Sequence, residues 1–277
     1  MLKMKFRPHL TAMLAVALAG AAPIANASVH SKAILKADNG ADFLFTSLHQ
    51  QYKEYPLSAA QGNKETGSIT GGALDLKGLG SIGLYTRLRT DYNRGNTDYV
   101  GHTLGGTPVA AKTHNQILNL AFQLGWGFGL GQRAALIPYA GVDVRAWRRA
   151  VDYGTPASYD EIYDFYDVGA GLLGQYAVTP KLVVSANAFV GRTHSPQMEA
   201  GLPQQLGGVQ TYNQGTGPVD RARLSVDYDA YGPVHLVAGV TYYHLAYGES
   251  NHLQNTSYEP ASRTNQLIYE VGVGVHL

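Results

Sequence analysis

The sequence predicts an all-β protein whose strands close into a single transmembrane antiparallel barrel of about ten strands, with eight or twelve as the alternatives. Three observations lead to this fold class. Segments of alternating polar and apolar residues recur along the chain, short and long connections follow one another in turn, and the last ten residues, Ile268 to Leu277, alternate strictly. A terminal strand with one wholly apolar face invites aggregation in water, so we expect lipid against this face and a neighbouring strand at its edge.

The N-terminus has the features of a secretory signal peptide. Lys3, Lys5 and Arg7 precede an uncharged stretch over residues 10–24, and Ala25-Asn26-Ala27 offers a small-residue cleavage site. The apolar stretch is shorter than the ~20 residues of a membrane-spanning helix, and a proline interrupts it. The expected division of the chain is a cleaved signal peptide over residues 1–27, a periplasmic segment over 28–40 and an outer-membrane barrel over 41–277.

Composition narrows the class further. The 277 residues include 33 Gly, 19 Tyr and no Cys, and only 15% are charged. No apolar run after the leader is long enough for a transmembrane helix, and the absence of Cys excludes disulfides and lipid attachment through a thiol. Without the leader the chain has 18 basic and 20 acidic residues. This balance gives no sign of a nucleic-acid partner, and no linker divides the chain, so we expect one domain.

Ten segments with strand-like alternation follow in chain order. They cover residues 42–54, 67–77, 81–94, 115–128, 135–153, 162–178, 182–197, 220–231, 234–249 and 268–277. Four short connections carry the turn sequences "GLG", "GLGQR", "TPK" and "GP". The long, polar connections are residues 56–66, 95–114, 154–161, 198–219 and 250–264. An even strand number with sorted connection lengths is typical of bacterial outer-membrane barrels, whose short turns and termini are periplasmic and whose long loops are extracellular.

The two faces of individual strands support a membrane barrel. In the fourth strand, Leu118, Leu120, Phe122 and Leu124 share a face opposite Asn119 and other polar or small residues. The fifth and eighth strands likewise oppose apolar residues to charged ones. A soluble barrel of the lipocalin kind has the same alternation with its apolar face inside. The sorted loops, the small residues on the polar face and the closing strand favour the membrane barrel.

The polar face of this barrel lines the lumen, and the apolar face carries aromatic residues near the expected membrane interfaces. The predicted charged lumen network is Arg87, Arg89, Asp91, Asp143, Arg145, Asp167, Arg221, Arg223, Asp227, Asp229 and Glu270. The predicted interface aromatics are Tyr52, Tyr92, Trp126, Phe128, Tyr166, Tyr176 and Tyr269. Because unpaired buried charge is costly and a barrel of about ten strands is narrow, we expect the lumen charges to pair and to narrow or seal it. The strand preference of Tyr is the alternative explanation of the aromatics.

The C-terminal strand carries a resemblance to small bacterial outer-membrane β-barrel proteins of the porin-like or opacity type. Glu270, Gly272, Val275 and Leu277 match the spacing of the insertion signal of such barrels, although their last residue is commonly aromatic and here is Leu. The resemblance covers residues 41–277 and the leader. It implies the outer membrane of a Gram-negative cell, contact with lipid and lipopolysaccharide, and recognition of the last strand by the barrel-assembly machinery.

Three functions remain open. The first is a narrow porin-like channel or small-solute binding barrel, the second is a non-conducting surface protein whose loops mediate adhesion or recognition, and the third is an outer-membrane hydrolase. We expect no enzyme. The omptin-type proteases use an Asp–His pair at the outer rim, and no Asp-x-His occurs here, while the neighbouring His194 and Ser195 are expected on opposite strand faces.

A last pair concerns metal binding. His235 and His276 are expected close together at the periplasmic mouth, but two ligands do not make a metal site. We therefore expect neither a metal nor a cofactor.

Overall fold

The computed structural model describes residues 29, 31–55, 62–102, 107–152, 154–155, 158–202, 208–253 and 258–277. The predicted signal peptide over residues 1–27 lies outside the described residues. Within the described part of the chain, no helix is long and apolar enough to cross a membrane.

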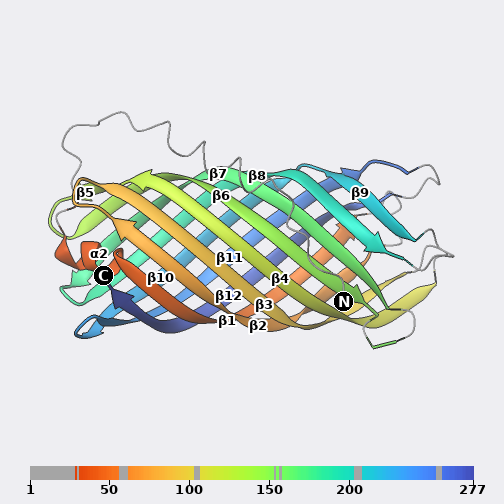
Figure 1. Ribbon diagram of the computed structural model, residues 1–277, viewed down its shortest axis with the longest axis horizontal. Helices are drawn as coiled ribbons and strands as arrows, with labels where there is room; N and C mark the ends of the chain where they lie inside the picture. Colours follow the sequence, from red (N-terminus) through yellow and green to blue (C-terminus); the bar gives the residue numbers. More distant parts are fainter. Residues whose placement is uncertain are drawn as a thin grey trace.

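Ten long antiparallel strands form a closed ring (Figure 1), which confirms the predicted fold class. They are β1 (Gly40–Tyr55), β2 (Lys64–Leu79), β3 (Leu84–His102), β4 (Pro108–Trp126), β6 (Ala134–Val151), β7 (Tyr159–Thr179), β8 (Leu182–Gly201), β10 (Pro218–Tyr231), β11 (Val234–Ser250) and β12 (Ala261–His276). Each strand pairs with its neighbours along the chain, and β12 closes the ring on β1. Two short strands were not predicted: β5 (Phe128–Leu130) pairs with β6, and β9 (Val209–Gly215) pairs with β8 and β11.

The connections are sorted between the two rims as the sequence predicts. Gly40 pairs with His276, so both ends of the ring lie at one rim, together with the short turns at 80–83, 131–133, 180–181 and 232–233. Gly131 and Gly232 have positive φ angles of 72° and 59°, which glycine adopts without steric cost. We call this the periplasmic rim and the opposite one, where the long connections lie, the extracellular rim.

The strands extend further than the sequence predicts on the extracellular side. The connection predicted over 95–114 is mostly strand, because β3 and β4 pair without interruption from Gly95 opposite Asn115 to His102 opposite Pro108. Strands of 14 to 21 residues exceed the ~9–11 that cross a bilayer. Both faces of such an extension meet polar surroundings, so the apolar alternation that marks a membrane-crossing strand is missing there.

The outer face of the barrel is apolar. Phe43 and Phe45 of β1 lie opposite Val273 and Val271 of β12, and all four side chains are at least half exposed. On the inner face of β1, Asp42 and its polar neighbours are buried. Exposed apolar side chains in a continuous belt and buried polar ones are the arrangement of a barrel surrounded by lipid.

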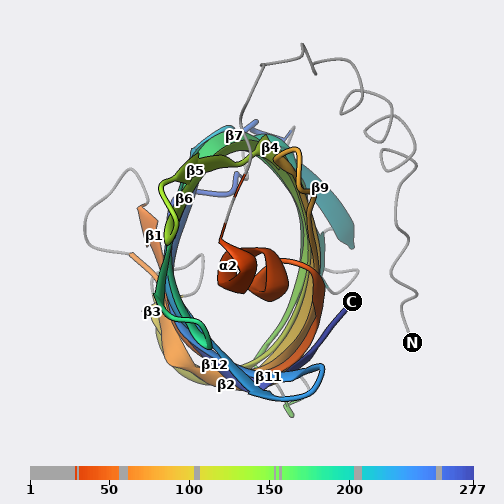
Figure 2. The same cartoon turned by 90° about the vertical axis from the view of Figure 1, so that its left-hand side faces the viewer.

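A short helix, α2 (Lys32–Ala37), lies inside the ring at the periplasmic rim (Figure 2). The Ser31 side chain accepts a hydrogen bond from the Ile34 N–H, and Ile34 itself is fully buried within the barrel. Lys36 forms an ion pair with Asp229 at 2.7 Å. Six residues are too few for a recognisable helical period, so this helix is not predicted from the sequence.

Candidate functional site

The lumen brings most of the charged side chains together, and they form three groups along the barrel axis. The periplasmic layer consists of α2 with Asp42, Lys77, Asp227 and His235. Lys77 pairs with Asp42 at 2.8 Å, and the His235 imidazole lies between Asp42 and Asp227, at 3.1 Å and 2.6 Å. Each carboxylate therefore has a basic partner. Asp42 and Lys77 were not in the predicted network, although each occupies an inward position of a predicted strand.

The C-terminus of α2 adds a further buried acid to this end of the barrel. Asp38 follows the helix, and its backbone N–H donates to the Ile34 carbonyl. Its side chain is buried, and this burial raises its pKa to about 6, although Lys77 and Arg87 lower it and Asp227 raises it. Because burial disfavours the charged form, protonation of Asp38 stabilises helix α2 in its position inside the barrel.

The central layer is an ion-paired network of arginines. The Arg87 guanidinium donates two hydrogen bonds to Asp75, and Arg89 binds Asp91 at 2.6 Å and Glu270 at 2.9 Å. The Arg89–Glu270 pair joins β3 to β12, which lie far apart in the sequence. Asp75 completes the network but was not predicted.

The other predicted members lie in the same layer. Arg223 also binds Glu270, and Arg221 binds Asp143 at 2.6 Å. Arg145 has no carboxylate partner among the described residues: it donates to Asn119 and Gln266 at 3.4 Å and lies 4.3 Å from the centre of the Tyr243 ring.

Asp167 is the remaining predicted member of the central layer. Both of its carboxylate oxygens are buried and lack a hydrogen-bond partner among the described residues.

The central layer also contains the cavity that limits passage through the barrel. A cavity of about 60 Å³ lies between Arg89, Arg145 and Arg223. Since one water needs at least ~10–15 Å³, the cavity has room for a few water molecules.

The extracellular cluster consists of Glu54, Glu65, Glu161 and Glu259 around Arg149. Arg149 is only 1% exposed and binds Glu65 at 2.8 Å and Glu161 at 2.5 Å. Thus four carboxylates face one guanidinium. Glu259 lies outside the strands, and its burial beside Glu54 and Glu161 raises its pKa well above the usual range.

Aromatic rings close the lumen around this cluster. Trp147 lies against Tyr52 and Tyr163, at ring-centroid distances of 5.7 Å and 5.3 Å, and Tyr163 stacks on Tyr247 at 6.0 Å. The Tyr163 hydroxyl donates to Glu259 at 3.0 Å. This cluster was not predicted from the sequence, because its members come from strands and a loop that are far apart in the chain.

The predicted position of Tyr52 at a membrane interface is wrong. Tyr52 is fully buried inside the barrel and donates a hydrogen bond to Glu54 at 3.0 Å. It has the same parity as Asp42, so the pairing of β1 with β2 and β12 turns it inward. Tyr55 is the exposed tyrosine at this end of β1.

The other predicted aromatics lie on the outer face. Tyr92, Tyr176 and Tyr269 are about half exposed, whereas Trp126, Phe128 and Tyr166 are partly covered. Tyr166 stacks on His194 with ring centroids 5.4 Å apart.

The four residues of the predicted insertion signal divide between the two faces of β12. Glu270 belongs to the central layer, and Val275 and Leu277 are exposed to the outside. A Cβ on Gly272 would lie 2.0 Å from the Phe43 carbonyl oxygen, so the close approach of β1 requires glycine there.

A bulge alters the geometry expected for His194 and Ser195. Ser195 has a positive φ of 48°, and the pairing of β7 with β8 shifts register at this point. Both side chains are exposed, so the expectation of strictly opposite faces was wrong. Among the described hydrogen bonds, none joins the two side chains.

Comparisons with known proteins identify the fold. No protein family and no curated protein sequence matches the chain. Among solved structures, the outer membrane protease OmpT from Escherichia coli superposes with a TM-score of 0.61 at 11% identity, over 87% of this chain and 97% of OmpT. The translocator domain of the autotransporter NalP from Neisseria meningitidis gives 0.42 at 11% identity, over 97% and 93% of the two chains. Ail, the attachment invasion locus protein of Yersinia pestis, gives 0.32 at 8% identity, over 86% and 99%.

Proposed function

We propose that this chain, which has the fold of an outer-membrane β-barrel, is a non-conducting surface barrel whose extracellular rim recognises a positively charged partner. This proposal chooses the second of the three functions that the sequence leaves open. It assigns the lumen a structural role and the extracellular end the functional one.

The main support for a non-conducting barrel is that side chains and helix α2 fill the lumen. Helix α2 occupies the periplasmic mouth, ion pairs such as Arg89–Glu270 span the central layer, and the rings of Tyr52, Trp147 and Tyr163 lie across the extracellular end. The cavity between these obstructions has room for a few waters only. This supports a sealed barrel over a porin-like channel.

The charge imbalance of the extracellular cluster supports a cationic partner. Every Asp and Glu of the sequence lies among the described residues, so the carboxylates can be counted completely. Arg149 pairs with Glu65 and Glu161, so Glu54 and Glu259 have no ion-pair partner among the described residues. A buried carboxylate without a counter-charge favours either a proton or a cation. A lysine or arginine side chain of a partner at this rim supplies that cation.

The same cluster gives little support to hydrolysis. Structural neighbours include a protease and non-enzymes, and likeness at 11% identity concerns the fold. Among the described residues, the hydrogen-bond and ion-pair partners of the four glutamate side chains are Tyr, Asn, Gln, Thr and Arg. A nucleophile activated by a neighbouring base is not among them.

A row of cations on the outer face supports lipopolysaccharide as the lipid partner. Lys64, Lys53 and Arg263 lie directly opposite one another on β2, β1 and β12, and all three are exposed. Lys53 and Arg263 both lie over the Tyr55 ring. Like charges in register repel each other, and none of the three has an ion-pair partner among the described residues. Lipid phosphates at this height would neutralise the row.

Two measurements test the proposed function. The barrel purified from outer membranes should give no discrete conductance steps in planar bilayers, as wild type or with Arg145→Ala or Arg223→Ala, because α2 and the aromatic rings still block the lumen. Steps whose size depends on either arginine would establish a narrow channel instead.

The second measurement concerns the partner. Cells that display the protein should bind a fluorescent oligolysine peptide, and Glu259→Gln should weaken this binding severalfold. Glu199→Gln, which changes an outward-facing glutamate of β8 near the same rim, is the matched control and should bind as wild type. Equal binding by the two variants would contradict recognition at the extracellular cluster.

A further inference from the structure

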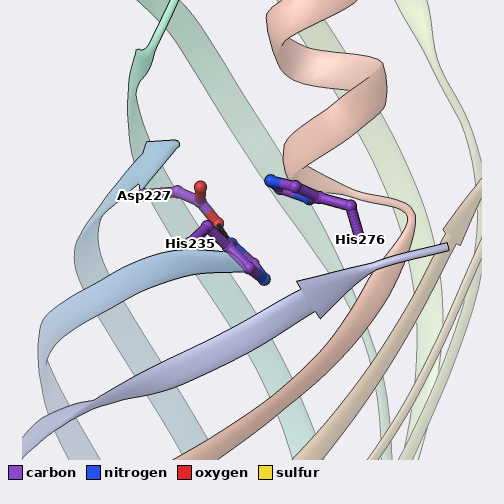
Figure 3. A group of neighbouring side chains, drawn as sticks. All are labelled: Asp227, His235 and His276. Carbon is purple, nitrogen blue, oxygen red and sulfur yellow. Dashed lines mark hydrogen bonds and ion pairs between the residues drawn. The ribbon is translucent and has the colours of Figure 1, made fainter. Parts of the chain in front are cut away.

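Three metal-ligating side chains meet at the periplasmic rim, where the proposed function assigns them no role beyond sealing. Asp227 of β10, His235 of β11 and His276 of β12 come from consecutive strands, and each offers one ligand atom within 4.8 Å of the others. Figure 3 shows them gathered inside the barrel wall next to α2. Two imidazoles and a carboxylate are donors that Zn²⁺ and related divalent transition metals accept. We propose that this cluster binds one such ion.

His276 is the ligand with the weakest competing contacts. Both of its ring nitrogens are shielded from solvent, and neither makes a well-formed hydrogen bond with the described residues, although the backbone of Lys36 lies close enough for a weak one. Its ring stacks on that of His235, with centroids 4.0 Å apart and planes inclined by 29°. Buried polar nitrogens without partners are unfavourable, and a metal ion that takes one of them removes this cost.

Asp42 provides the outer support that metal-binding histidines usually have. Its Oδ1 lies 3.1 Å from His235 Nε2, and Asp227 Oδ2 lies 2.6 Å from His235 Nδ1. Because the Asp42 carboxylate beside Nε2 favours a proton on that nitrogen, Nδ1 is the nitrogen that faces Asp227 and the ion. A proton held between Nδ1 and Asp227 must then leave for solvent, so each ion that binds displaces one proton from this pair.

The charges around the cluster favour a cation. Asp42 and Asp227 contribute two negative charges, and Lys77, at 2.8 Å and 3.8 Å from them, contributes one positive charge. Lys36 is already paired with Asp229. With neutral histidines the net charge facing the ion is negative.

The geometry needs a small adjustment. Ligand bonds of 2.0–2.2 Å in a tetrahedral site place the ligand atoms about 3.3 Å apart. The His235 and Asp227 atoms, now 2.6 Å apart, must therefore separate slightly, and the more distant ligand atoms, within 4.8 Å, must approach by at most about 1.5 Å. Rotation of the His276 and Asp227 side chains can supply this movement. The bound ion would then join the ends of β10, β11 and β12 at the seam where the ring closes, beside α2.

The test uses the whole barrel, purified from outer membranes in detergent without a polyhistidine tag, since such a tag adds ligands. After treatment with a chelator, Zn²⁺ is titrated by calorimetry in two buffers that differ in ionisation enthalpy. We expect one ion per chain and release of about one proton. Replacing Zn²⁺ by Co²⁺ should give the visible absorption of a site with nitrogen ligands.

Variants locate the ion. His276→Phe keeps a ring stacked on His235 and should weaken binding at least tenfold, and Asp42→Asn, which leaves the ligands intact, should weaken it roughly 10–100-fold. His194→Phe changes an exposed histidine of the outer face and should bind as wild type. Heat-modifiable gel mobility checks that each variant is folded.

The proposal fails if wild type binds no Zn²⁺ at submillimolar concentration and gives no Co²⁺ absorption. Equal affinity of wild type and His276→Phe would also overturn it. Should a variant not fold, the stoichiometry, proton release and Co²⁺ spectrum of wild type still decide the question.

Discussion

The two ends of the lumen are closed in different ways. At the periplasmic rim a piece of backbone, α2, fills the opening, and Asp42, Asp227 and Asp229 each have a basic partner. At the extracellular end side chains alone close the lumen, and four glutamates share Arg149. At the periplasmic end the ion pairs hold α2 in place. At the extracellular end two of the four glutamates have no ion-pair partner among the described residues, and a proton or a cationic partner can neutralise them, so we locate recognition there.

The sharpest test of this difference is the removal of Arg149. Arg149→Ala leaves the surrounding glutamates without a cation, and breaking a buried ion pair in this way costs about 3–5 kcal/mol. Denaturant unfolding in detergent, followed by gel mobility, should report this loss. Arg148→Ala removes the adjacent, outward-facing arginine, whose pair with Asp160 is partly exposed, and should cost at most about 1 kcal/mol. Similar losses in the two variants would remove the distinction between the two ends.

The pH should affect how firmly helix α2 is held at the periplasmic end. Asp38 is buried and its pKa is raised from 3.8 to about 6, so the folded state holds the proton more tightly than the unfolded chain. The stability of the seated helix should be greatest below about pH 4 and fall by up to about 3 kcal/mol as the pH rises through about 6. Hydrogen exchange of the α2 amides should therefore be faster at pH 8 than at pH 5, after correction for intrinsic rates.

The control for this prediction is Asp38→Asn, which keeps the shape of the side chain without its titration. Its α2 protection should not change over this pH range. A pH dependence that survives the substitution would assign the effect to another group, with Lys77, Arg87 and Asp227 as the charged neighbours.

Loss of one cation should lower the free energy of unfolding less at the periplasmic layer than at the extracellular cluster. In Lys77→Ala, Asp42 still has His235 at 3.1 Å, so we expect a loss of about 2 kcal/mol, typical of one charged hydrogen bond. The same unfolding measurement applies. A loss as large as that of Arg149→Ala would contradict the view that the periplasmic pairs support one another.

The smallest effect concerns the outer face. Arg263→Ala removes one member of the exposed cation row and should change stability in lipopolysaccharide-free detergent by less than about 1 kcal/mol, in the stabilising direction, because like charges no longer face each other. In the presence of lipopolysaccharide the sign should reverse. Lys112→Ala is the control, because Lys112 is already paired with Asp98. The same sign under both conditions would argue against a phosphate at this row.

The sequence by itself determined the barrel, its number of long strands, the sorting of short and long connections between the two rims, and most of the charged residues of the central layer. These follow from local patterns: alternation assigns each strand two faces, and short turns can join only neighbouring antiparallel strands. The wrong placement of Tyr52 also has a local origin. Tyr52 was assigned to the lipid face as an aromatic residue, but it lies an even number of residues from Asp42 on β1, and both side chains are buried inside the barrel.

Only the tertiary structure decided which side chains meet across the lumen. Arg89 and Glu270 are 181 residues apart, and Arg149 and Glu65 are 84 apart. Their contacts depend on the stagger of strands around a closed ring, which no local pattern contains. The same is true of α2: six residues cannot form a stable helix in water, so its existence depends on the barrel wall that surrounds it.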